Sequence, residues 1–183
     1  MLSIGLIREG KVPPDKRVPF SPAQVREIQQ LFPGISLQVQ HSELRCYRDD
    51  EYAALGIPVT EDVSGCDILM GIKEVPVDML VSGKTYLFFS HTIKKQPYNR
   101  KLLSAILDRN IRLIDYETLK DTQGNRLVAF GRYAGIVGAY NGLWTYGHKT
   151  GAFSLRRAYE CFDVNDLKLE LRKVVMPGVK IIL

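Results

Sequence analysis

The stretch Leu2-Ser-Ile-Gly-Leu-Ile7, followed after a proline-rich loop by Ser21-Pro-Ala-Gln24, predicts a buried strand that leads to a helix. Ser21 is suited to cap the free N–H groups of this helix, and Gln24 at the third helical position completes a capping box. A Pro-Gly pair ends the helix near Phe32. Strands that alternate with helices in this way are typical of parallel α/β folds.

The same alternation continues along the chain. Further strands are predicted by apolar runs at residues 36–40, 67–72, 85–89 and 111–114. Helical periodicity is found at residues 49–55 and 98–109. We therefore expect a three-layer α/β fold with a mainly parallel sheet and helices on both faces, because parallel sheets are covered on both sides. C-terminal helices and the first strand of an incomplete Rossmann domain are expected to follow.

The character of the sequence changes after residue 120. A turn at residues 121–125 is expected to join two short strands, because its glycine or asparagine can take a positive φ. Residues 129–148 are interpreted as a helix that packs closely against a neighbouring backbone and links two domains. Its small residues recur at helical spacing, namely Ala134, Gly135, Gly138, Ala139 and Gly142. Charged helical residues are expected at 155–173.

These patterns divide the chain into three expected parts. We expect an α/β domain at residues 1–130, an interdomain helical segment at residues 131–175, and the first strand of a truncated dinucleotide-binding domain at residues 176–183. Such a strand normally leads into a glycine-rich phosphate loop, yet the sequence contains no Gly-x-Gly-x-x-Gly. We therefore expect one wall of an active site without the other.

Composition excludes several classes of function. The 183 residues are 45% apolar and 25% charged, and the net charge of +5 comes from lysines and arginines interleaved with acids, which argues against a nucleic-acid surface. Cys46, Cys66 and Cys161 follow no metal-ligand spacing, and their odd number argues against a disulfide framework. No apolar run reaches membrane-spanning length. A cytoplasmic protein with no membrane partner is expected.

Charged residues follow several of the predicted strands. Ligands of parallel α/β sheets bind beyond the carboxyl ends of the strands, where Arg17, Lys73 and His91 are expected to converge. An arginine can pair with a carboxylate, a lysine can polarise an oxo group or move a proton, and a histidine can accept a proton near neutral pH. Taken singly, each residue also fits a second interpretation, as a solvated charge or a structural histidine.

The motifs at these positions extend over nearly the whole chain. Residues 4–9 (IGLIRE) with 16–22 (KRVPFSP), 71–76 (GIKEVP) and 88–94 (FFSHTIK) resemble the N-terminal domain shared by alanine dehydrogenases, proton-translocating transhydrogenases and saccharopine dehydrogenases. Residues 112–117 (RLIDYE), the turn at 123–126 (QGNR) and 129–135 (AFGRYAG) most closely resemble the saccharopine dehydrogenase and lysine-ketoglutarate reductase branch.

This resemblance implies that residues 1–130 are a substrate and catalytic domain, and it implies roles for individual residues. Arg17 corresponds to the arginine that contacts the substrate carboxylate, Lys73 to the active-site lysine, and His91 to the acid–base histidine. Glu74 and Glu117 correspond to acidic residues near that site. The resemblance also implies oxidation of a CH–NH bond in an amino acid, with NAD or NADP bound by the full-length enzyme and none by this fragment, which is expected to be inactive alone.

Other interpretations remain open from the sequence. Within the enzymes, an alanine dehydrogenase-like domain is the main alternative. A stand-alone module that binds an amino acid or 2-oxo acid without converting it is a second alternative, and nucleic-acid binding is a weaker third. Exposed C-terminal elements could also join two copies into a homodimer.

Overall fold

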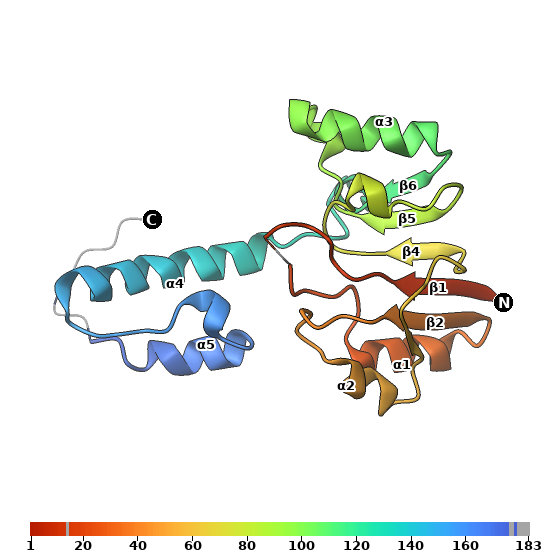
Figure 1. The fold of residues 1–183 in the computed structure, drawn as a ribbon. Helices are drawn as coiled ribbons and strands as arrows, with labels where there is room; N and C mark the ends of the chain where they lie inside the picture. Colours follow the sequence, from red (N-terminus) through yellow and green to blue (C-terminus); the bar gives the residue numbers. More distant parts are fainter. Residues whose placement is uncertain (14, 176–177, 179–183) are drawn as a thin grey trace. The chain divides into compact units, whose positions relative to one another are not determined.

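The computed structural model describes residues 1–13, 15–175 and 178, and the chain divides into two compact units, Met1–Val128 and Ala129–Leu183 (Figure 1). The terminal strand that we predict at residues 179–183 lies outside the described residues, as does most of the truncated domain expected at 176–183.

A six-stranded sheet forms the centre of the first unit (Figure 1). Its strands are β1 (Leu2–Leu6), β2 (Ile35–Gln40), β3 (Val59–Thr60), β4 (Ile68–Met70), β5 (Thr85–Phe88) and β6 (Arg112–Asp115). The order across the sheet is β3-β2-β1-β4-β5-β6, and every neighbouring pair is parallel. Five strands were predicted within a residue or two of these bounds. β3 was not predicted, because two residues carry no periodic signal.

One face of the sheet is covered by α1 (Pro22–Leu31) and α2 (Asp49–Ala53). The predicted capping box of α1 is present: Ser21 Oγ accepts from Gln24 N–H at 3.4 Å, and the Gln24 side chain accepts from Ser21 N–H at 2.9 Å. Val25 of α1 and Tyr52 of α2 pack with Leu37 of β2 in the core of this face. Burial of these side chains holds both helices on the sheet.

The opposite face is covered by α3 (Arg100–Asp108), which follows the 3₁₀ turn η3 (Pro97–Asn99). Leu102 and Ile106 of α3 pack with Tyr86 and Phe88 of β5 in a second core. The expected three-layer fold is therefore confirmed. Shorter 3₁₀ turns follow the strands, namely η1 (Val77–Met79), η2 (Thr92–Lys94) and η4 (Tyr116–Thr118).

The turn at residues 121–125 differs in part from the prediction. Gly124 takes the expected positive φ of 85°, but the two short strands are wrong, since only a single antiparallel bridge joins Lys120 and Arg126. The loop carries few apolar residues that could anchor a longer ladder on the sheet.

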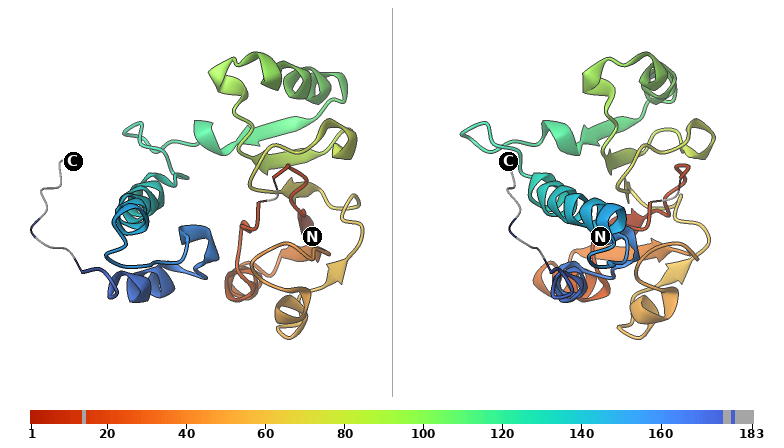
Figure 2. Two further views of the ribbon diagram at one scale, coloured as in Figure 1. Left: turned by 60° about the vertical axis from the view of Figure 1, so that its left-hand side comes forward. Right: turned by 90° about the vertical axis from the view of Figure 1, so that its left-hand side faces the viewer.

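The second unit contains α4 (Gly131–Thr150), η5 (Ala158–Glu160) and α5 (Val164–Leu171). Figures 1 and 2 show α5 beside α4, and Tyr140, Leu155 and Leu167 form the core between them. The continuous helix expected at 155–173 is shorter than predicted. Among the described residues, none of the helices combines the length and the hydropathy that a membrane span requires.

The glycines of α4 also differ from the prediction. Apart from the backbone of α4 itself, a Cβ atom added at Gly135, Gly138 or Gly142 would meet no described atom within 4 Å, so the close packing expected there is not formed within the second unit. Gly147 is instead the tightly packed glycine, because an added Cβ would lie 2.6 Å from Phe153.

Candidate functional site

The carboxyl ends of the parallel strands lie along one edge of the sheet and position the polar residues of the first unit (Figure 1). Glu9 follows β1, Lys73 and Glu74 follow β4, His91 follows β5, and Glu117 follows β6. Four strands that are neighbours in the sheet therefore deliver charged side chains to the same edge. This is the edge at which ligands of parallel α/β proteins bind.

His91 lies between two carboxylates. Its Nδ1 is 3.0 Å from Glu117 Oε2, and its Nε2 is 3.8 Å from Glu74 Oε1. Lys94 Nζ lies 3.0 Å from the same Nδ1, and the ring stacks on Phe89 with centroids 6.3 Å apart. The imidazole is half-buried and is contacted at both nitrogens. This arrangement gives it a fixed orientation and neighbours with which to exchange protons.

Glu117 is buried, with 5% of its surface exposed, and is surrounded by cationic groups. In addition to His91, Lys94 Nζ lies 3.4 Å and Arg126 Nη1 3.8 Å from its Oε1. Burial alone would raise the pKa of this carboxyl, but the hydrogen bond and charge of His91 and the charge of Lys94 outweigh burial and lower it. The side chain is therefore an anion at neutral pH.

Glu74 is held in a similar way from the opposite side of the imidazole. Lys11 Nζ donates to its Oε2 at 2.7 Å. Burial raises the pKa of Glu74, yet the hydrogen bond and charge of Lys11, together with the charge of His91, bring about a net decrease. Two ionised carboxylates thus flank the ring of His91.

Lys73 belongs to a second group of charges beside the first. Its backbone N–H donates to Glu9 Oε2 at 2.9 Å, while the N–H of Ile72 donates to Glu9 Oε1 at 2.6 Å. Burial raises the pKa of Glu9 despite these two hydrogen bonds. One carboxylate therefore ties the loop after β1 to the segment that carries Lys73.

Arg17 lies in this second group. Its guanidinium pairs with Asp15 at 2.6 Å and remains 43% exposed. Burial raises the pKa of Asp15, but hydrogen bonds from Arg17 and the charges of Arg17 and Lys73 give a net decrease. Glu9, Asp15 and Arg17 line the same small pocket.

The five predicted site residues are thus distributed over two groups. His91, Glu74 and Glu117 are in direct contact, whereas Arg17 pairs with Asp15 and the backbone N–H of Lys73 pairs with Glu9. Glu74 follows Lys73 directly in the chain and so connects the groups. The predicted roles of all five residues stay predictions, because no contact with a substrate is described.

The sequence did not single out Glu9, Asp15, Lys11 or Arg126 as site residues. Glu9 follows the first strand directly, which was the available signal for its placement. Lys11, Asp15 and Arg126 reach the edge from loops whose paths depend on tertiary contacts. No local spacing could have indicated their partners.

The backbone at His91 is in the left-handed region, with φ 56° and ψ 10°. For a residue with a Cβ this conformation costs about 1 to 3 kcal/mol and persists where the surroundings enforce it. Such residues are concentrated at functional sites. The conformation is therefore an independent structural indication that the position of His91 matters.

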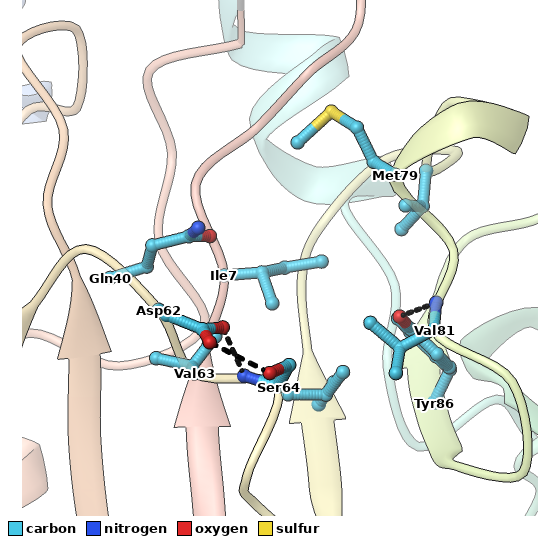
Figure 3. Close-up of a pocket in the computed structure, with 10 residues that line it drawn as sticks. Ile7, Gln40, Asp62, Val63, Ser64, Met79, Val81 and Tyr86 are labelled. Atoms are coloured by element: carbon cyan, nitrogen blue, oxygen red, sulfur yellow. Dashed lines mark hydrogen bonds between the residues drawn. The ribbon is translucent and has the colours of Figure 1, made fainter.

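A pocket of about 220 Å³ is separate from these charges (Figure 3). Figure 3 shows Asp62, Val63 and Ser64 on one side and Val81 and Tyr86 on the other. None of the five predicted site residues lines it, and of the described residues no lysine or arginine does so. The pocket is therefore unsuited to hold a carboxylate substrate. No cluster of three or more potential metal ligands is found among the described residues.

A parallel sheet with charged side chains at the carboxyl ends of its strands defines a ligand-binding class of α/β domain. The family described as "Alanine dehydrogenase/PNT, N-terminal domain" matches residues 5–137, and the chain belongs to this family. The predicted resemblance is confirmed.

Similar proteins support the saccharopine branch. The mitochondrial alpha-aminoadipic semialdehyde synthase of Mus musculus is 41% identical over 133 residues, which cover 73% of this chain and 14% of that protein. The saccharopine dehydrogenase [NAD(+), L-lysine-forming] of Yarrowia lipolytica is 30% identical over 145 residues, which cover 76% of this chain and 39% of that enzyme. The chain thus spans less than half the length of these relatives.

Solved structures support the fold. An L-alanine dehydrogenase matches with a TM-score of 0.65 at 16% identity, over 83% of this chain and 43% of the dehydrogenase. The transhydrogenase from Sinorhizobium meliloti has a TM-score of 0.62 at 16% identity, over 82% and 45%. At this identity the likeness establishes the architecture alone.

Proposed function

We propose that the chain is the substrate-binding domain of an NAD(P)-dependent amino-acid oxidoreductase that acts on CH–NH bonds, of the saccharopine dehydrogenase type. The main support is the position of His91 between the ionised carboxylates of Glu74 and Glu117. The saccharopine dehydrogenase among the relatives supports the reaction class.

The dinucleotide site is proposed to lie outside the described residues. The sequence contains no Gly-x-Gly-x-x-Gly loop, and the described residues therefore do not fit a pyrophosphate-binding turn. We propose NAD or NADP as the cofactor of the full-length enzyme. We expect no dehydrogenase activity from the chain alone. Measurable NAD(P)H oxidation by the isolated chain would contradict this expectation.

We propose a role in this reaction for each of the five site residues. Arg17 anchors the carboxylate of the amino acid or 2-oxo acid through its two-pronged guanidinium. Lys73 and His91 act as a coupled acid–base pair that takes up and returns protons at the reacting nitrogen. Because Nδ1 of His91 is engaged by Glu117 and Lys94, we assign the proton transfer to Nε2. Glu74 and Glu117 hold the imidazole and balance its charge.

Binding to the 183-residue chain tests the substrate class. We expect lysine, glutamate or 2-oxoglutarate to raise the melting temperature, because a ligand that binds the folded state stabilises it in proportion to RT ln(1 + [L]/Kd). Arg17→Met should abolish the rise. Arg112→Met, at the amino end of β6, is the matched control and should retain it.

Three outcomes would change the proposal. Stabilisation by alanine and pyruvate alone would favour the alanine dehydrogenase-like alternative. A rise that survives Arg17→Met would contradict the carboxylate role of that arginine. Binding without turnover by the complete polypeptide would instead favour the stand-alone binding module.

The cellular location and the assembly of the protein are also proposed. We retain the cytoplasm as the proposed location, although the mouse relative is mitochondrial. A homodimer through elements of the second unit is also retained, and light scattering that shows a clean monomer would contradict it.

A further inference from the structure

Buried polar side chains are concentrated around His91. Among the described residues, five polar or charged side chains are buried, and four of them, Ser90, Asn99, Asp115 and Glu117, lie around this histidine. Burying a polar group is unfavourable unless it is hydrogen-bonded, and each of these four side chains has a partner. These four side chains therefore form a buried hydrogen-bonded network around His91.

The centre of this structure is a link between the ends of β5 and β6. The Ser90 hydroxyl donates to Asp115 Oδ2 and accepts the N–H of Thr92 at 3.1 Å. The second oxygen of Asp115 accepts the N–H of Glu117 at 2.8 Å. Asp115 thus holds the segment that bears Glu117, and Ser90 holds the segment that bears His91.

The same link explains how His91 keeps its left-handed backbone. The conformation is fixed on both sides, by Ser90 with Thr92 and by Asn99, whose Nδ2 donates to the carbonyl of His91 at 3.2 Å. A strained backbone persists only where its surroundings determine it. Backbone pairing of Phe88 with Asp115 and the ring contact of Phe89 with Tyr116 also join these strand ends. The Ser90–Asp115 hydrogen bond is a direct side-chain link between the segments that bear the imidazole and the Glu117 carboxylate.

We propose that Ser90 and Asp115 are positioning residues that set the imidazole of His91 against the carboxylate of Glu117 for proton transfer. The inference rests on the proposed function, because it assigns these residues to the same reaction. Neither residue is proposed to touch the substrate. Misplacement of a reacting group by about 1 Å can lower a rate about a hundredfold, so the link is expected to affect turnover more than binding.

The chain provides a matched control at the opposite end of the sheet. Ser3 Oγ donates to Asp67 Oδ2 at 2.7 Å and joins β1 to the start of β4 with the same two residue types. Ser90→Ala and Ser3→Ala therefore remove the same kind of hydrogen bond, and both are expected to lower the melting temperature. In the complete polypeptide, Ser90→Ala should reduce kcat about tenfold or more with KM unchanged, whereas Ser3→Ala should retain kcat.

Asp115→Asn serves as the second variant if Ser90→Ala does not fold, with Asp67→Asn as its control and the same expectation. Equal kcat in the Ser90 and Ser3 variants, or in the two Asn variants, would overturn the positioning role. Loss of turnover in His91→Gln but not in Ser90→Ala would refute the inference alone. Full turnover in His91→Gln would refute the proposed function instead.

A readout that does not depend on activity is available in the 183-residue chain. The sequence has three histidines, His41, His91 and His148, so their ring signals can be assigned by NMR. Ser90→Ala should shift the ring signals of His91, which stacks on Phe89, and leave those of His41 and His148 in place. Unchanged His91 signals would contradict the link.

Discussion

Glu117 lies buried among His91, Lys94 and Arg126, and its charge is therefore part of the folding free energy. Because the pKa of its carboxyl is lowered in the folded state, the folded chain favours the ionised form. This contribution is fully present above the pKa of the unfolded chain and is lost as the pH falls through the lower folded value.

The Glu117→Gln variant should show this dependence. At pH 7 we expect a loss of about 1 to 3 kcal/mol in the free energy of unfolding, because cationic groups lose a buried partner. The difference from the unchanged chain should shrink below about pH 4. Urea unfolding at several pH values measures both. Glu27→Gln on the exposed side of α1 is the control, and a pH-independent loss in Glu117→Gln would contradict the account.

For single residues, the sequence predicts where a side chain lies on the sheet better than it predicts which residues that side chain contacts. Arg17, Lys73 and His91 were expected at one edge because parallel strands end there together. Lys73 and His91 do follow β4 and β5, and Arg17 lies in the loop after β1, while their convergence on one substrate stays a prediction. The pairing of Glu117 with Arg126 and of Glu74 with Lys11 could not be predicted, because it depends on loops that come from distant parts of the chain. The left-handed backbone of His91 also had no signal, since histidine does not require it.

Helix α4 shows how glycines of one element differ in their surroundings. Apart from the backbone of α4 itself, Gly138 has no described atom within 4 Å of the position that a Cβ would occupy, whereas Gly147 faces the ring and the carbonyl oxygen of Phe153 at 2.6 Å. Both lie within the same helix. A substitution at Gly138 therefore tests helix propensity, and one at Gly147 tests packing.

Alanine substitutions at these glycines should have opposite effects. Gly138→Ala should stabilise the second unit by about 1 kcal/mol, because alanine favours helix over glycine by that amount. Gly147→Ala should destabilise it by about 1 to 3 kcal/mol, because the added methyl forces Phe153 to move. Thermal unfolding followed by circular dichroism measures both changes. Destabilisation by Gly138→Ala would show that this position is packed, as the sequence first suggested.

Elements with several consistent signals were predicted well. The capping box and the Pro-Gly pair defined α1 almost to the residue, and the apolar runs located five strands. The segment at 155–173 was predicted less well, because its charged residues suit a helix while their ion pairs with neighbouring segments, such as Arg156 with Asp166 and Glu170, hold part of it in turns. Tertiary contacts decide where local propensity is weak.

The chain belongs to the family of alanine dehydrogenase and transhydrogenase N-terminal domains through residues 5–137, and it spans only part of the length of its relatives. The sequence predicted this family because its motifs occur in a consistent order along most of the chain. The strand expected at the C-terminal end could not be compared, since it lies outside the described residues. The proposed activity therefore has to be tested in the complete polypeptide.

The central claim is that Lys73 and His91 form the acid–base pair of an amino-acid dehydrogenase. The most direct measurement is the steady-state turnover of the complete polypeptide that carries this chain, with Lys73→Met and His91→Gln, and with Lys101→Met on the exposed side of α3 as control. We predict that each of the first two variants loses about a hundredfold or more in turnover, as removal of a positioned acid or base does, while the control retains it. Near-normal turnover in both variants would contradict the account.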